Sequence, residues 1–211
     1  MATTYKNLPK DSIDGYLAYV KISKPNLNTF GAEPKQEYSL NVFISEKQAK
    51  EFKKRVVEGK KINKTIKEIE TSAFKDKYKF DPPFPDQDDQ YFITITQNVN
   101  KTNGEPLPDF LRPKSYLYVD KGEGKYGTKD ITDQEIGNGS FGTVRYHQQD
   151  GINGISIKLD AVLVKDFIPY VSTNKDEWAA LAEDSPVTKP IVNTSSTPVA
   201  TKTEEEDDLP F

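Results

Sequence analysis

The residues of this 211-residue chain that are best suited to chemistry lie in its second half. Ile136–Val144 reads IGNGSFGTV, which fits G-x-G-x-x-G-x-V, the pattern of a loop that covers the phosphates of ATP. Lys158 follows within Ile155–Lys158, where a phosphate-binding lysine would stand on the next strand. Nucleotide chemistry is therefore the first hypothesis that the residue types raise.

The rest of that chemistry is missing from the chain. Phosphoryl transfer by a kinase needs a catalytic loop with Asp and Asn and a metal-binding Asp before Phe-Gly. No such segment follows Lys158, and the only histidine, His147, precedes it. We therefore interpret the segment as a turn at Gly137 and Gly139, because glycine permits left-handed backbone and close approach. The turn leads into a strand whose inward side carries Gly142, Val144 and Tyr146.

Other catalytic and metal-binding chemistry finds few residues. The absence of Cys excludes disulfides, thiolate zinc sites and Cys nucleophiles, and a single His excludes His-rich metal sites. Asp86, Asp88 and Asp89 could offer oxygen ligands to a divalent cation. No Gly turn or later Glu completes a calcium loop, so a solvated loop is the stronger interpretation. We expect no enzymatic activity, no cofactor and no metal.

Charge divides the chain into two parts. Residues 1–170 hold 26 Lys or Arg and 24 Asp or Glu, whereas residues 171–211 hold 3 and 9. This asymmetry predicts a body that tolerates a polyanion and a tail that repels one, although a solvated helix face with a solubilising tail would give the same balance. The chain has neither a long apolar run nor an N-terminal signal core, so we expect a cytoplasmic protein, in the host cell if it is viral.

Alternation of apolar and polar residues predicts most of the secondary structure. Ser45 with Gln48 forms a capping box for a helix that Gly59 would end. Isoleucines 62, 66 and 69 suggest a second helical piece, which gives a helical insert at about 45–72. The predicted strands, with Lys121–Thr128 left as a loop, are Ser12–Ser23 with Tyr16, Ala18, Val20 and Ile22 on one side, then Glu37–Ile44, Tyr91–Gln97, Ser115–Asp120, Phe141–Gln149 and Ile155–Phe167.

The order of these elements favours a mainly β fold. Two strands, a helical insert and further strands suit a closed barrel, since closure removes exposed edges. We expect an OB-fold-like barrel of five to six strands over residues 1–170, with a jelly-roll-like sandwich as the alternative. Residues 184–203 are a low-complexity mix of Pro, Thr, Ser and Val, and we expect residues 171–203 to form a flexible linker. Residues 204–211 form the acidic end of what we expect to be a disordered tail.

The predicted strand phases place aromatic rings and cations on outward faces. Nucleic-acid bases stack on exposed rings at about 1–3 kcal/mol each, and cations follow the phosphates. We expect about half of the outward rings to be packed under helices or long loops instead. The candidate contacts to a single strand are Tyr19, Lys21, Lys35, Phe43, Phe92, Arg112, Lys114, Tyr116, Tyr118 and Arg145.

The last residues of the chain combine charge with an apolar end. Glu204–Asp208 is a run of acids, and Leu209, Pro210 and Phe211 follow it. A terminal aromatic residue with its carboxylate can fill a pocket with a basic rim, and the acids can steer it there. A random acidic tail is the alternative. The predicted partner-binding tip is Asp207, Asp208, Leu209, Pro210 and Phe211.

Glu206–Phe211 resembles the C-terminal tip of bacterial single-stranded DNA-binding proteins, which docks onto replication and repair partners. The body resembles the OB-fold single-stranded DNA-binding proteins of tailed bacteriophages in Val20–Ile44, Ile136–Arg145 and Gly154–Val164. The resemblance implies sequence-nonspecific binding of single-stranded DNA in replication, recombination and repair, with a tip that recruits partner enzymes. The helical insert and the Asp81–Gln90 loop depart from the bacterial pattern. We therefore expect a monomer or homodimer rather than a tetramer.

Two alternatives to this function remain open from the sequence. The body could be an OB-like RNA-binding module, which would have to recognise the 2′-OH. It could also be a protein–protein adaptor whose tail mimics the bacterial tip.

Overall fold

The computed structural model describes residues 10–29, 34–57, 59–101, 103–151 and 154–171. In this part of the chain no helix is long and apolar enough to cross a membrane. The elements are β1 (Lys10–Asn28), β2 (Lys35–Ile44), α1 (Glu46–Lys54), β3 (Val56–Val57), β4 (Lys60–Lys61), β5 (Lys67–Glu70), α2 (Thr71–Tyr78), β6 (Asp89–Asn98), η1 (Asp109–Leu111), β7 (Lys114–Asp120), β8 (Tyr126–Asp130), β9 (Phe141–Gly151) and β10 (Gly154–Asp166).

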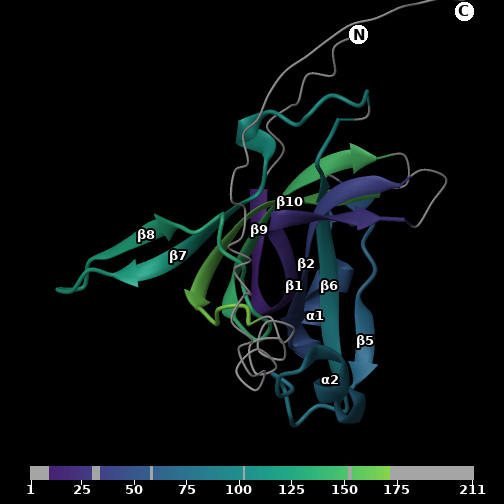
Figure 1. Cartoon of the computed structure of the whole chain (residues 1–211). Helices are drawn as coiled ribbons and strands as arrows, with labels where there is room; N and C mark the ends of the chain where they lie inside the picture. The colour runs from purple at the N-terminus through teal and green to yellow at the C-terminus, as the bar shows by residue number, and fades with distance from the viewer. Residues whose placement is uncertain (1–9, 30–33, 58, 102, 152–153, 172–211) are drawn as a thin grey trace, which may run out of the picture. The chain divides into compact units, whose positions relative to one another are not determined.

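Five strands close into a barrel, and α2 lies at its lower end in Figure 1. β1 pairs with β2 and β9, β2 pairs with β6, and β9 pairs with β10, all antiparallel. A parallel contact between Thr96 of β6 and Lys158 of β10 completes the circuit. The fold is therefore mainly β and a five-stranded barrel of the OB type, as the sequence predicts.

The barrel core is apolar and draws on every barrel strand. Its fully buried side chains include Leu40 and Val42 of β2 and Ile93 and Ile95 of β6, in the predicted alternation. Burial of such side chains is the main force that holds the barrel together, because each one removes apolar surface from water. The residues between them, which point outward, are left to build the surface.

β1 changes face at Tyr19, whose φ of 51° marks an irregularity in the strand. The register with β2 shifts directly after Ala18, so an extra residue enters one strand of the pair. Before the shift, Leu17 points into the core, whereas Tyr16 and Ala18 pack outside the barrel. The predicted face of β1 is therefore wrong for Tyr16 and Ala18 and correct for Val20 and Ile22.

The insert between β2 and β6 begins as predicted and then departs from the prediction. The Ser45 hydroxyl accepts a hydrogen bond from the Gln48 amide, and the Gln48 side chain accepts one from the Ser45 amide at 2.9 Å. The helix ends at Lys54, before Gly59. The second helical piece is wrong, because residues 62–70 are extended, with Ile62 bridged to Ile155 of β10 and β5 paired with β6.

The barrel itself explains this extended segment. β6 and β10 touch at a single residue pair, which leaves the wall of the barrel thin between them. Ile62 and Ile66 pack against the core from that side. The isoleucines have the spacing of a helix, but their segment is not helical. Ile62 and Ile66 instead cover the gap between β6 and β10.

α2 covers the outer face of the barrel at one end. Phe74 and Tyr78 of the helix pack on Phe43 and Phe92, with ring centroids 4.9 Å apart for Phe43–Phe74 and 4.8 Å for Phe43–Tyr78. Burial raises the pKa of Tyr78 to about 12. The result is a second apolar layer outside the barrel wall.

A hairpin of β7 and β8 leaves the barrel and projects from it in Figure 1. β7 pairs in parallel with β10 beyond the point where β6 does, for example at Leu163–Tyr116. Tyr126–Asp130 belongs to β8, so the predicted loop Lys121–Thr128 is wrong at its second end.

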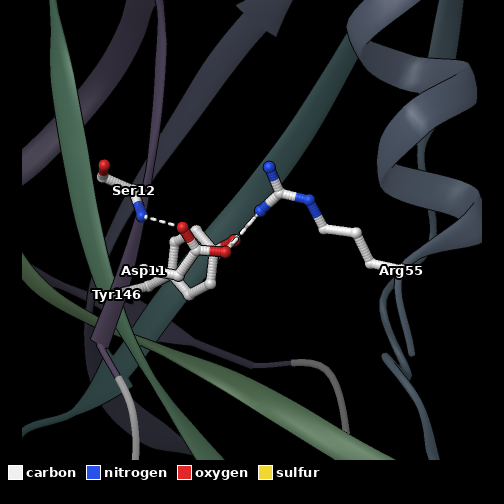
Figure 2. A network of polar contacts seen from close by, with 4 residues as sticks. All are labelled: Asp11, Ser12, Arg55 and Tyr146. Carbon is white, nitrogen blue, oxygen red and sulfur yellow. Dashed lines mark hydrogen bonds and ion pairs between the residues drawn. The ribbon is translucent and has the colours of Figure 1, made fainter. Parts of the chain in front are cut away.

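A polar network ties the start of β1 to the end of α1 and to β9 (Figure 2). The Tyr146 ring is buried in the core, and its hydroxyl donates to Asp11 at 3.1 Å and accepts from Arg55 at 2.8 Å. Arg55 also pairs with Asp11 at 2.5 Å, and the Ser12 amide donates to the other Asp11 oxygen. Burial raises the pKa of Tyr146. The network closes one end of the barrel.

Candidate nucleic-acid interface

One row of outward side chains runs across four barrel strands. Lys21 of β1 pairs with Ser39 of β2, Ser39 pairs with Thr96 of β6, and Thr96 pairs with Lys158 of β10. Residues that lie side by side in a sheet point to the same face. With strands about 4.8 Å apart, this cross-strand row spans roughly 14 Å. It has an ammonium group at each end and hydroxyl groups between them.

The surface beside the cross-strand row is polar and uncharged toward α2. Thr94 of β6 and Asn41 of β2 lie on the same face, two residues from Thr96 and Ser39. The Thr94 hydroxyl donates to the Asn41 amide oxygen at 2.8 Å. The aromatic layer under α2 begins directly beyond them, at Phe43 and Phe92. The cross-strand row therefore lies where the cover of the outer face ends.

Positive charge gathers at the β10 end of the cross-strand row. Burial lowers the pKa of Lys64, and the ammonium groups of Lys158 and Lys67 lower it further, against a weaker opposing effect of Glu37. Such mutual repulsion means that an anion placed among these lysines would be stabilised. The Lys67 ammonium also lies 5.9 Å from the centre of the Phe92 ring.

Tyr19 and Lys21, both predicted contacts, lie at the other end of the row. Tyr19 is exposed, its ring lies 5.3 Å from that of Tyr78, and its hydroxyl donates to the Lys77 carbonyl. The Lys21 ammonium lies 5.9 Å from the ring of Tyr170. An exposed ring beside a lysine is the combination that holds a stacked base and its phosphate.

Arg112 and Lys114 line a cleft of about 340 Å³ with Tyr38. Arg112 donates to the Leu107 carbonyl and lies 3.2 Å from Asp109. Lys114 is exposed at the start of β7. These two predicted residues thus come together in a cleft that is also lined by Ile22 and Tyr38, the chain neighbours of Lys21 and Ser39.

Tyr116 and Arg145 share a groove of about 420 Å³ whose floor includes Ala161 and Leu163. Tyr118 lies farther along the β7–β8 hairpin, stacked on Tyr126 with centroids 5.1 Å apart and planes 24° apart. Burial raises the pKa of Tyr118. The remaining predicted cation, Lys35, is exposed at the start of β2.

Phe43 and Phe92, which the sequence predicts as contacts to a single strand, are buried in the structure. Phe43 is 0% exposed and Phe92 is 6% exposed, because α2 packs over both rings. Neither ring offers a face to a base in this structure. Apart from Lys35, the other predicted contacts therefore form three surface groups and not one aromatic platform.

Sequence reasoning missed the middle and one end of the cross-strand row. Ser39 and Thr96 alternate with buried residues and so point outward. A hydroxyl side chain is a weaker indication of nucleic-acid binding than an aromatic ring or a cation. Lys158 was considered only as a nucleotide ligand, although Ile157 and Leu159 on either side of it are buried and so point it outward. No signal in the sequence indicates a role for Lys64, because the isoleucine spacing of its segment predicts a helix.

The glycine-rich segment is a turn whose amides are used inside the protein. The Gly137 amide donates to the Ile168 carbonyl at 2.8 Å, and the Gly139 amide donates to the Leu17 carbonyl at 2.9 Å. Gly139 has a φ of +90°, which requires glycine. These amides are not available to a nucleotide phosphate, so the interpretation as a turn is confirmed.

Asn138 in the same turn links β1 to α2. Its side chain accepts from the Tyr19 amide at 2.8 Å and donates to the Tyr78 carbonyl at 2.9 Å. Gly142 then passes so close to β10 that a Cβ there would lie 2.5 Å from the Leu163 carbonyl oxygen. The motif is explained by backbone packing.

The described residues include no group of three or more His, Cys, Asp or Glu that is placed to hold a metal ion. The predicted linker, residues 171–203, lies outside the described residues except for Val171. The predicted tip, Asp207, Asp208, Leu209, Pro210 and Phe211, lies wholly outside them.

The fold and the cross-strand row define a class: an OB-type barrel with a basic, hydroxyl-lined outer face. Among solved structures the chain is similar to single-stranded DNA-binding proteins of bacteriophages. One is gp2.5 of bacteriophage T7, with 17% identity, a TM-score of 0.40 and coverage of 86% of this chain and 98% of that one. Another is the protein from bacteriophage Enc34 in complex with ssDNA, with 17% identity, a TM-score of 0.37 and coverage of 77% and 89%. No protein-family model and no curated protein matches the chain.

Proposed function

We propose that the protein binds single-stranded DNA without sequence preference along the cross-strand row and performs no chemistry on it. The observation that carries this proposal is the row itself: lysines at both ends, hydroxyl groups between them, and further lysines crowded at the β10 end. The outer face of the second and third strands is where OB barrels bind oligonucleotides.

The chemistry of the row favours a backbone-directed, sequence-tolerant contact. Lys21 and Lys158 present ammonium groups, which attract phosphates but carry no information about the base. Ser39 and Thr96 add hydrogen-bonding groups between them. Tyr19 offers a ring on which any base can stack. Unpaired bases must be accessible for such stacking, so a single strand fits better than a duplex.

The other predicted surface residues extend this proposal. Arg112 and Lys114 in their cleft, Lys35 at the start of β2, and the group of Tyr116, Tyr118 and Arg145 would contact a strand that continues past the row. Each phosphate that is neutralised releases counterions and steepens the salt dependence of binding. We propose that the protein acts in this way as a monomer or homodimer in the cytoplasm.

The C-terminal tip extends the proposal to protein partners. The residues Asp207 to Phe211 combine charge, an apolar side chain and a terminal carboxylate, which together suit a basic pocket on a replication, recombination or repair enzyme. Replacement of Phe211 with Ala should abolish capture of such a partner while oligonucleotide binding stays unchanged. Unchanged capture would contradict the docking role.

Fluorescence anisotropy with labelled oligo(dT) tests the DNA-binding proposal. The double variant Lys21→Ala/Lys158→Ala should bind more weakly, and its salt slope should fall by about 0.7 for each lost phosphate contact. Lys47→Ala, an exposed lysine of α1, is the matched control and should behave like the unmodified chain. Equal losses in both variants would contradict a role for the row.

Two further comparisons separate the alternatives. Oligo(U) of equal length should bind more weakly than oligo(dT); a clear preference for oligo(U) would favour an RNA-binding module. A matched duplex should bind far more weakly than the single strand. If no oligonucleotide binds at low salt, even after removal of residues 204–211, the protein is an adaptor for other proteins.

A further inference from the structure

The register of the barrel continues the cross-strand row past β10. Lys158 also pairs with His147 of β9, and His147 pairs with Lys10 of β1. Paired residues share a face, so His147 stands between two lysines on the outer surface. The circuit thus returns to β1, the strand on which the row began at Lys21. Arg145 points to the same side, two residues along β9.

A nearly buried carboxylate organises this second set of cations. The side chain of Asp160 is 9% exposed, and its oxygens lie 3.2 Å from the Lys10 ammonium and 2.5 Å from Nε of Arg145. The side chains of Lys10 and Arg145 remain 54% and 51% exposed. One carboxylate therefore fixes two cations while their other donors face solvent. With Lys158 alongside, the cluster keeps an excess of positive charge.

His147 is the proton-sensitive member of the cluster. The charged groups that face it are Lys10 from β1 and Lys158 and Asp160 from β10, and Arg145 lies on its own strand. Burial lowers the pKa of His147, Lys10 and Lys158 lower it further, and Asp160 opposes them. Burial and the two lysines therefore disfavour the charged ring, Asp160 favours it, and an added anion would favour it further.

We propose that the Lys10–Arg145–His147–Lys158 cluster is a second phosphate site of the DNA-binding surface, at which His147 takes up a proton as a phosphate of the bound strand settles between the lysines. The inference rests on the proposed function and adds to it a path around the barrel and a coupling to pH. A phosphate offsets the charges of Lys10 and Lys158, so the imidazolium gains a second anionic partner beside Asp160.

The sign of the coupling follows from linkage. The pKa of His147 is higher with DNA bound than without it, so binding carries a proton onto the protein. The added affinity is fully present below the pKa of the free protein and is lost as the pH rises through the pKa of the complex. Each unit by which the pKa rises corresponds to up to about tenfold tighter binding at low pH.

His147 is the only histidine of the chain, so its ring proton on Cε1 gives one assigned NMR signal. The full chain is titrated from pH 5 to pH 8, the range over which histidine changes charge, alone and with saturating oligo(dT). We expect the oligonucleotide to move the midpoint upward. An unchanged midpoint with bound oligonucleotide would overturn this inference and leave the proposed function standing. Absence of binding at every pH would overturn both.

A third arm uses inorganic phosphate at the same phosphate concentration. A small or absent shift is expected, since a free ion lacks the rest of the strand to hold it. An equal shift would mean that the cluster is a site for free anions and would overturn its place on the DNA path.

Variants separate a role in binding from a role in folding. His147→Gln should bind oligo(dT) at pH 8 like the unmodified chain and should lose the extra affinity at pH 5.5. Lys10→Ala should reduce the midpoint shift, whereas the control Lys47→Ala should leave it intact. A pH dependence that survives in His147→Gln would assign the proton to another group and contradict the proposal.

Discussion

Phe43 and Tyr118 show how far a single side chain depends on what lies above it. Alternation places both rings on outward faces of their strands. Phe43 is completely buried under α2, whereas Tyr118 is 37% exposed on the β7–β8 hairpin. The first ring holds the fold together, and the second is available to a ligand.

These environments predict truncation effects of the same sign but of different size. Phe43→Ala should lower the free energy of unfolding by about 3–5 kcal/mol, because it leaves a cavity among packed rings. Tyr118→Ala should cost less than about 1.5 kcal/mol, since it removes mainly one stacked pair with Tyr126. Urea denaturation followed by circular dichroism measures both. Similar losses in the two variants would show that the hairpin contributes to the core.

For single residues, the sequence predicts the strand face on which a side chain lies. It does not predict whether another element covers that face. Ser39, Asn41, Thr94 and Thr96 alternate with buried residues, and they lie on the outward face as that pattern requires. The fate of Phe43 and Phe92 depended on α2, which the sequence pattern did not place. An alternating strand reports which residues share a face, and only the tertiary structure decides whether solvent or a helix meets that face.

Among the elements, the polar network in Figure 2 couples three pieces of chain that are far apart in sequence. Asp11 opens β1, Arg55 follows α1, and Tyr146 lies within β9. The Tyr146 ring anchors the network in the core while its hydroxyl reaches the two charged groups. The Tyr146 hydroxyl therefore adds a polar link between the end of α1 and the barrel, beside the buried Ala49 and Phe52 of the helix.

Tyr146→Phe keeps the ring and removes that oxygen. We expect a loss of about 1–2 kcal/mol in the free energy of unfolding, because hydrogen bonds to charged groups exceed neutral ones in strength while both partners here are partly exposed. A double-mutant cycle with Asp11→Asn, measured by denaturant unfolding, should give a non-additive result. Strict additivity would mean that the two groups act independently.

The elements that sequence missed carry little periodic signal of their own. β8, Tyr126–Asp130, is exposed at nearly every position, so no apolar alternation marks it. β5 pairs with β6 through backbone groups, and its isoleucine spacing imitates a helix. By contrast, α1 was predicted from its capping box, because that signal is local and needs no partner.

On the scale of the whole molecule, charge separates the body from the tail. Residues 1–170 carry a slight excess of positive charge, and residues 171–211 carry 9 acids against 3 bases. A tethered polyanion competes with DNA for basic surface at a high effective concentration. The competition should weaken as salt screens the charges.

Deletion of residues 204–211 should therefore tighten oligo(dT) binding at low salt and change it little at high salt. Anisotropy titrations of both chains at two salt concentrations give the comparison. Weaker binding after the deletion would show that the tail assists the strand instead of competing with it.

The sequence predicts the fold class, a closed barrel, but it does not predict which residues close the barrel. The order of strands and helical insert favours a closed barrel, with a jelly-roll-like sandwich as the alternative. The contact that closes it is one residue pair, Thr96 with Lys158, supported by Ile62 and Ile66 from a segment whose spacing predicts a helix instead. Such a seam depends on register around the whole circuit, which no local spacing encodes.

The return of that circuit to β1 has a mechanical consequence. Lys21 and Lys10 lie toward opposite ends of one strand, and the proposed path of the DNA begins and ends on them. Tension along the DNA would pull on β1 along its own length, so its hydrogen bonds to β2 and β9 would bear the load together. Sheets loaded in this shearing direction resist far more force than sheets peeled open one bond at a time.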